Sequence, residues 1–95
     1  MKIKIDSNLI LPGLERENEI QFNSSKVTLL MVLEELSSKS SGRVKYIHPS
    51  TGAVDPMNFV IEINGIRSQG SREDLKTILN EGDLITIKVL PLGGG

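Results

Sequence analysis

Short stretches in which apolar residues recur at every second position occur near both ends of this chain. The same alternation recurs twice in between, so that it is found at residues 2–6, 19–23, 59–63 and 84–90. A period of two places every second side chain on one face of an extended strand and predicts half-buried strands. The side chains expected to face the core are Ile3, Ile5, Ile20, Phe22, Phe59, Ile61, Ile63, Ile85, Ile87 and Val89.

One segment between these strands has helical spacing instead. From Thr28 the chain reads TLLMVLEELSSK, and its apolar residues recur at i, i+3, i+4 and i+7. Thr28 is the expected N-cap, with Ser24 and Ser25 as alternatives, and Gly42 is the expected stop. The buried face of this helix is predicted to be Leu29, Val32, Leu33 and Leu36.

Residues that are typical of turns recur in the second half of the chain. Asn64-Gly65 directly follows an alternating segment and predicts a tight hairpin with a return strand at 66–67. Residues 72–79 can form one or two helical turns, with Ser71 as N-cap. Gly82-Asp83 then predicts a turn before the last strand.

The order of elements favours an α+β domain, a sheet with its single main helix on one face. The last strand is expected to pair with the first, in parallel, at the centre of the sheet. Residues 37–58 are the least regular stretch, within which we expect a short strand at 44–47 or a short helical turn. The length of 95 residues predicts one domain, residues 1–90, followed by a flexible tail, 91–95.

Composition excludes several kinds of chemistry. The chain has no cysteine and one histidine, His48, so a thiol nucleophile, a disulfide scaffold and a zinc site are not expected. With a net charge of -1, the chain lacks the excess of positive charge that is typical of proteins that bind nucleic acid. The chain has no apolar run long enough to span a membrane, and its start, MKIKID, lacks the apolar core of a signal peptide. We therefore expect a cytoplasmic protein with no bound cofactor or metal.

The last five residues are Pro91, Leu92, Gly93, Gly94 and Gly95. Proline ends the strand, and three glycines have no side chains to pack, so this segment is either a frayed end or a functional one. Five residues reach about 17 Å, far enough to enter another protein's active site. The terminal carboxylate is ionised at neutral pH and could attack the α-phosphate of ATP.

Three features together resemble the ubiquitin-like sulfur carriers of the MoaD/ThiS family. They are the β-β-α order, the sequence IEINGIR at 61–67, and EGDLITIKVLPLGGG at 81–95. In that family one strand ends in an Asn-Gly turn, a Gly-Asp turn opens the last strand, and the chain finishes at a diglycine. The resemblance covers nearly the whole chain and extends to the archaeal small modifier proteins.

The resemblance implies a β-grasp fold, with a mixed sheet of four or five strands wrapped on one helix. It also implies that an E1-like adenylyltransferase activates the C-terminal pair Gly94 and Gly95, at the carboxylate of Gly95, using ATP and magnesium. Pro91, Leu92 and Gly93 would thread into that enzyme. A sulfurtransferase would then supply sulfur for a thiocarboxylate. The sulfur would go to a molybdopterin-type cofactor, to thiamine thiazole or to tRNA. In the first case the partner would be the large subunit of molybdopterin synthase. Alternatively, Gly95 would be joined to lysines of target proteins.

A carrier of this kind must dock on its activating enzyme. Strand parity places some apolar residues on the outer face of the sheet or in the tail, and we expect a docking patch made of Val60, Leu84, Leu90 and Leu92. The free protein is expected to be a monomer. The main alternative is a passive ubiquitin-like interaction domain whose tail has no function. A stand-alone enzyme has little support, because the chain has no convergent catalytic motif.

Overall fold

The computed structural model describes residues 1–7, 18–41 and 44–90. Among these residues it has one α-helix, one short 3-10 helix and seven strands. In chain order they are β1 (Lys2–Ser7), β2 (Glu19–Gln21), β3 (Val27–Thr28), α1 (Leu29–Lys39), β4 (Phe59–Ile63), β5 (Ile66–Ser68), η1 (Asp74–Lys76), β6 (Ile78–Leu79) and β7 (Leu84–Val89).

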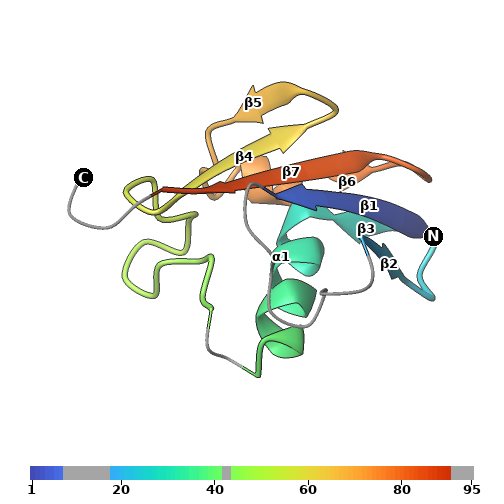
Figure 1. Ribbon diagram of the computed structural model, residues 1–95, viewed down its shortest axis with the longest axis horizontal. Coiled ribbons are helices and arrows are strands. Elements are labelled where there is room, and N and C mark those ends of the chain that lie inside the picture. The colour runs from blue at the N-terminus through green and yellow to red at the C-terminus, as the bar shows by residue number, and fades with distance from the viewer. Residues whose placement is uncertain (8–17, 42–43, 91–95) are drawn as a thin grey trace.

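Five strands form one mixed sheet in the order β2-β1-β7-β4-β5, with α1 packed on one side of it (Figure 1). The last strand, β7, lies at the centre. It runs parallel to β1, where Ile5 pairs with Ile85, and antiparallel to β4, where Ile61 pairs with Ile87. The predicted parallel pairing of first and last strands is therefore confirmed, and so is the β-grasp architecture.

The core fills the space between the sheet and α1, and it is mainly aliphatic. Ile3, Ile85 and Ile87 are completely buried, as strand parity predicts. The predicted helix face is also buried. Thr28 is the N-cap, since its Oγ1 accepts a hydrogen bond of 3.3 Å from the Met31 backbone N–H. The helix ends at Lys39 with Ser40 as C-cap, and the predicted stop at Gly42 falls outside the described residues.

Two parts of the sequence prediction are wrong. Residues 44–47 form no strand; only Ile47 makes an isolated bridge, to Val54. The segment is instead fastened by side chains of α1, because the Ser37 hydroxyl donates to the Val44 carbonyl (2.8 Å) and the Ser40 hydroxyl accepts from the Val44 N–H (3.1 Å). Tertiary hydrogen bonds thus replace the ladder that a strand would need.

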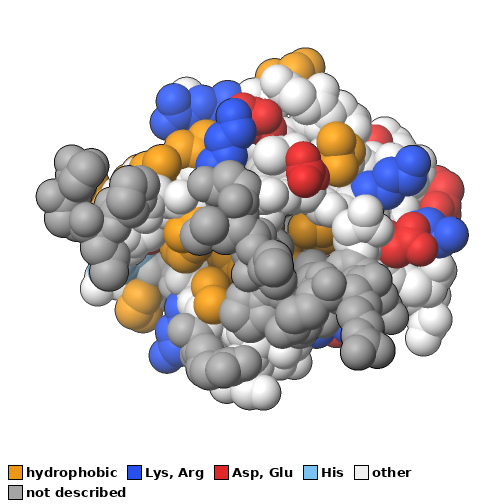
Figure 2. All heavy atoms as spheres, in the orientation of Figure 1, with side chains coloured by type: hydrophobic (Ala, Val, Ile, Leu, Met, Phe, Trp, Pro, Cys, Tyr) orange, Lys and Arg blue, Asp and Glu red, His pale blue; other side chains and the backbone are white. Residues whose placement is uncertain are grey.

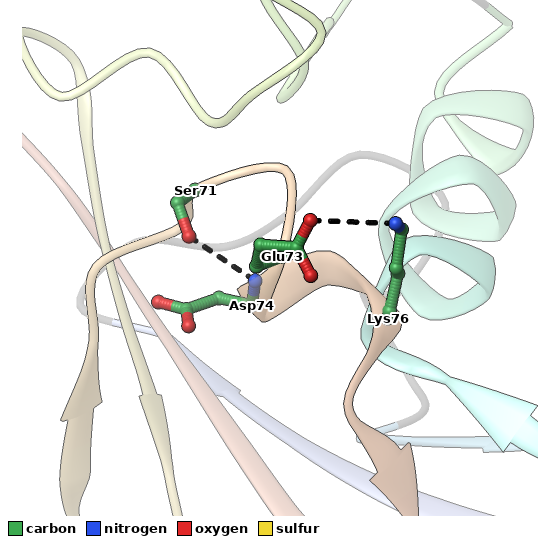
Figure 3. Close-up of polar contacts among 4 residues, drawn as sticks. All are labelled: Ser71, Glu73, Asp74 and Lys76. Carbon is green, nitrogen blue, oxygen red and sulfur yellow. Dashed lines mark hydrogen bonds and ion pairs between the residues drawn. The ribbon is translucent and has the colours of Figure 1, made fainter.

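The other error concerns the end of residues 72–79. One helical turn, η1, is present as predicted. Ile78 and Leu79, however, form strand β6, which pairs with β3 in a second, two-stranded sheet. Pairing Leu79 with Val27 buries both side chains almost completely. The predicted cap is present before the turn: the Ser71 hydroxyl accepts from the Asp74 N–H at 3.1 Å, beside a Lys76–Glu73 contact of 3.4 Å (Figure 3).

Of the helices that the structure describes, none is both long enough and apolar enough to cross a membrane.

Candidate functional site

The C-terminal end of the central strand is held firmly in place. Beyond the last residue of β7, the Leu90 N–H donates a hydrogen bond of 2.8 Å to the Asn58 carbonyl. Asn58 is itself fixed, because its side-chain amide donates to Asp55 Oδ2 at 2.8 Å. The loop before β4 and the end of β7 therefore lie side by side (Figure 1). The chain leaves the domain from a well-ordered position.

Two aromatic rings pack on the core side of the C-terminal end of β7. Tyr46 and Phe59 pack with their ring centres 4.9 Å apart, and Phe59 pairs with Val89 across the β4–β7 ladder. Tyr46 is 2% exposed, and this burial raises the pKa of its hydroxyl above the usual value. Sequence reasoning missed this core residue, since no periodic pattern surrounds it.

The residues predicted to carry the chemistry lie outside the described residues. These are the activated Gly95 and Gly94 and the threading residues Pro91, Leu92 and Gly93. What the structure gives is the position and direction of the strand that precedes them. The candidate site is therefore the end of β7 together with the surface around it.

The predicted docking patch is spread along the sheet. Val60, Leu84 and Leu90 are each half-buried. Val60 lies opposite Lys88, one diagonal step from Leu90, whereas Leu84 lies opposite Lys4 near the other end of β7. The register thus brings Val60 and Leu90 together near the exit and places Leu84 about 20 Å away, at 3.3 Å per residue. Leu92 lies outside the described residues, and the docking role of the patch stays a prediction.

Charged side chains lie among these apolar positions and on the neighbouring strands β1 and β2. The Lys88 ammonium contacts Glu62 at 3.1 Å, and that of Lys2 lies 3.9 Å from Glu19. Figure 2 shows one face of the molecule, on which hydrophobic side chains occur in separate spots among acidic and basic ones. Such a mixed surface suits a protein that binds partners transiently.

Two turns that look independent in the sequence are joined in the structure. Asn64 adopts a positive φ of 52° in the hairpin turn, with Gly65 at 83°. Its side chain accepts from the Leu84 N–H at 2.9 Å and donates to Asp83 Oδ1 at 3.1 Å. Asp83 Oδ2 also accepts from the Asn80 N–H at 2.7 Å. The Asn-Gly and Gly-Asp motifs thus form one network that fixes the start of β7.

This network predicts a measurable coupling between Asn64 and Asp83. Asn64→Gly keeps the positive φ but removes the side-chain hydrogen bonds, and is expected to cost about 1–2 kcal/mol of unfolding free energy. Asp83→Ala should cost a similar amount. In a double-mutant cycle measured by urea denaturation, the two should be coupled by about 0.5–1.5 kcal/mol. Ser71→Ala, which removes a separate cap, is the control, and additive effects of Asn64→Gly and Asp83→Ala would contradict the network.

Two shallow hollows occur among the described residues. One, of about 480 Å³, lies between β5 and η1 and is lined by Ile63, Asn64, Ile66, Arg67, Ser68, Gln69, Asp74 and Thr77. The other, of about 360 Å³, includes Leu84 and lies over β1 and β2.

No group of three His, Cys, Asp or Glu side chains in the described part of the chain is arranged to hold a metal ion.

Comparison with known proteins found relatives by structure. No protein-family model and no curated protein sequence matches the chain. Among solved structures, SAMP1 from Haloferax volcanii has a TM-score of 0.68 at 13% identity, with 100% of both chains covered. A putative molybdopterin converting factor, subunit 1, from Pyrococcus furiosus has a TM-score of 0.65 at 15% identity, covering 96% of this chain and 99% of that one.

A third structure is more similar in sequence. Urm1 from Sulfolobus solfataricus is 25% identical, with a TM-score of 0.58, and the match covers 92% of this chain and 99% of that one. All three matches extend over nearly the full length of both chains. The chain therefore has the β-grasp fold of the ubiquitin-like modifiers and sulfur carriers, the family that its sequence resembles.

Proposed function

We propose that this chain is a ubiquitin-like carrier whose reactive group is the carboxylate of Gly95. The observation that carries the proposal is a Gly-Gly-Gly sequence three residues after the central strand of a β-grasp domain. Leu90 is hydrogen-bonded to Asn58 at the end of that strand. A rigid body with a short, side-chain-poor extension is suited to delivering a carboxylate into another protein's active site.

The chemistry begins with activation by an E1-like adenylyltransferase. A carboxylate oxygen of Gly95 attacks the α-phosphorus of ATP, the bond to pyrophosphate breaks, and an acyl adenylate forms. The magnesium ion and the ATP belong to the activating enzyme, where they neutralise and orient the phosphates. The chain is accordingly a substrate of that enzyme and supplies no catalytic group of its own.

The activated glycine then meets a nucleophile. The terminal sulfur of a persulfide on a sulfurtransferase attacks the carbonyl carbon and displaces AMP, which gives an acyl disulfide. A cysteine thiol of the enzymes then cleaves the S–S bond, forms a disulfide with the sulfurtransferase and leaves a thiocarboxylate on Gly95. The thiocarboxylate can deliver sulfur to a molybdopterin-type cofactor, through the large subunit of its synthase, or to tRNA. Attack by a lysine amine of a target protein gives an isopeptide instead. Both routes use one activated carboxylate. The names of the structural relatives, which include a small archaeal modifier and a molybdopterin converting factor subunit, support proposing both.

The mass of the protein from its native cell distinguishes these fates. We expect a fraction of the purified chain to have sulfur in place of one terminal oxygen, or to be found as a Gly95 isopeptide on lysines of other proteins. A chain that acts only as a passive interaction domain would have an unmodified terminus. It would also recover the same partners in a pull-down after Gly94 and Gly95 are deleted. These two results together would overturn the proposal.

A further inference from the structure

Met57 exposes more of its side chain than any other large hydrophobic residue in the described ranges. It is 79% exposed, against 75% for Ile66 and 54% for Ile78. It stands on the turn that leads into β4 and contributes nothing to the core. Its side chain therefore gains no burial from folding and is available for burial against another protein.

The turn that presents Met57 is rigidly built. Asp55 Oδ1 accepts from the Met57 N–H at 3.0 Å, and Asp55 Oδ2 accepts from the Asn58 amide at 2.8 Å. The Asp55 carbonyl also accepts from the Asn58 and Phe59 N–H groups. Both carboxylate oxygens of Asp55 are thus engaged within the turn. The backbone at Met57 is fixed, while its side chain projects into solvent.

The same turn holds the point where the chain leaves the domain. Asn58, the residue after Met57, accepts the hydrogen bond from Leu90. Five residues follow Leu90, and even fully extended they span only about 17 Å. A protein that binds Gly95 in its active site must therefore have part of its surface within about 17 Å of Leu90. The turn that carries Met57 is hydrogen-bonded to Leu90 and is within reach of such a surface.

We propose that Met57 is a docking residue for the adenylating enzyme that activates Gly95. Its side chain would enter an apolar pocket beside the entrance through which that enzyme receives residues 91–95. An unbranched thioether adapts well to such a pocket. The neighbours Pro56 and Asn58 are uncharged, and both carboxylate oxygens of Asp55 are engaged within the turn, which suits docking in an apolar pocket. The proposal rests on the proposed function and adds a specific contact to it.

The test uses the full chain, the adenylating enzyme from the same organism, ATP, magnesium and labelled pyrophosphate. The rate of ATP–pyrophosphate exchange is measured against the concentration of the carrier. Met57→Glu is expected to raise the half-saturating concentration about tenfold or more while changing the maximal rate less than about twofold. Met57→Leu should stay within about twofold of the wild type. So should Ile66→Ser, which removes an equally exposed apolar side chain beyond the far end of β4.

Each other outcome has a definite meaning. A wild-type chain that supports exchange, with Met57→Glu unchanged, would overturn the docking role and leave the proposed function intact. A wild-type chain that supports no exchange would overturn both. If Ile66→Ser weakened exchange as much as Met57→Glu, the loss would follow from making any exposed apolar site polar and not from Met57 itself. That result would overturn the proposal. The proposal would also be overturned if the free protein were a dimer that Met57→Glu dissociates. It would likewise be overturned if the methyl groups of Met57 and Leu92 were found in contact in the free protein. Thermal unfolding of each variant checks that an effect on exchange does not come from loss of the fold.

Discussion

Replacing Gly70 by alanine is expected to destabilise the domain by about 3 kcal/mol or more, the largest effect of any single methyl group in the described part of the chain. Two costs combine at this buried position. Gly70 has a φ of 68°, which side chains other than hydrogen disfavour. A Cβ there would also lie 2.6 Å from the Cβ of Val54. The close approach is built into the fold, because the Val54 N–H donates to the Gly70 carbonyl.

Gly65→Ala separates these two costs. Gly65 has a positive φ of 83°, but an added Cβ would meet nothing within 4 Å. Its expected cost is the backbone term alone, about 1–2 kcal/mol. The free energy of unfolding of both variants can be measured by urea denaturation. In a Val54→Gly background, the additional cost of Gly70→Ala should fall toward that of Gly65→Ala. Equal costs of the two alanine substitutions in the wild-type background would contradict the steric account.

Deleting Gly94 and Gly95 is expected to reduce adenylation of the chain by at least about a hundredfold, to the background of the enzyme alone. The truncated chain still ends in a glycine carboxylate, that of Gly93. This carboxylate falls short of its normal position by about 7 Å, two extended residues, and a misplacement of 1 Å already costs catalysis heavily. ATP–pyrophosphate exchange with the activating enzyme measures the loss.

Stability provides the control for this deletion. The described core and its hydrogen bonds end at Leu90, so the truncated chain should keep its free energy of unfolding within about 0.5 kcal/mol. Exchange that proceeds equally well without the two glycines would contradict a role for the terminus. A truncated chain that unfolds would be compared instead with one in which alanines replace both glycines. That chain keeps its reach but adds two methyl groups that the active site must accommodate, so a smaller loss of exchange is expected.

The main sheet and the helix could be predicted because local periodicity determines them. Ile3 and Ile5 alternate with lysines, and Leu29, Val32 and Leu33 follow a helical stripe, so each local pattern agrees with the face that the fold buries. The parallel pairing of β1 and β7 required a further inference from the order of the elements. Asn64-Gly65 was sufficient to locate the hairpin, since both residues adopt the positive φ that this turn needs.

The remainder depends on contacts between distant residues. Strands β3 and β6 contain two residues each, too few to give a period, and they exist because Val27 and Leu79 pair within the core. Tyr46 is buried in an irregular segment through its contact with Phe59. The bond from Asn64 to Asp83 joins residues 19 positions apart. A local sequence pattern does not indicate contacts between residues so far apart in the chain. For the same reason the sequence did not distinguish Met57 from other loop residues.

Composition alone left the candidate site open. Three glycines after a strand were compatible with a frayed end or a functional one, and the resemblance favoured the functional end and supplied its chemistry. What the structure adds is the exit geometry: a central strand whose end is fixed to the Asn58 turn, with Met57 beside it. This geometry supplies a candidate contact for the activating enzyme that strand parity alone did not indicate.

Trapping the activated carboxylate tests the central claim most directly. Hydroxylamine added to the chain, its adenylating enzyme, ATP and magnesium attacks an acyl adenylate at the carbonyl carbon and releases AMP, leaving a hydroxamate. Mass spectrometry of the C-terminal peptide should locate this hydroxamate on Gly95 and show that its formation requires ATP. Activation of the chain with no hydroxamate on Gly95, or with the modification on an aspartate or glutamate side chain instead, would contradict the account.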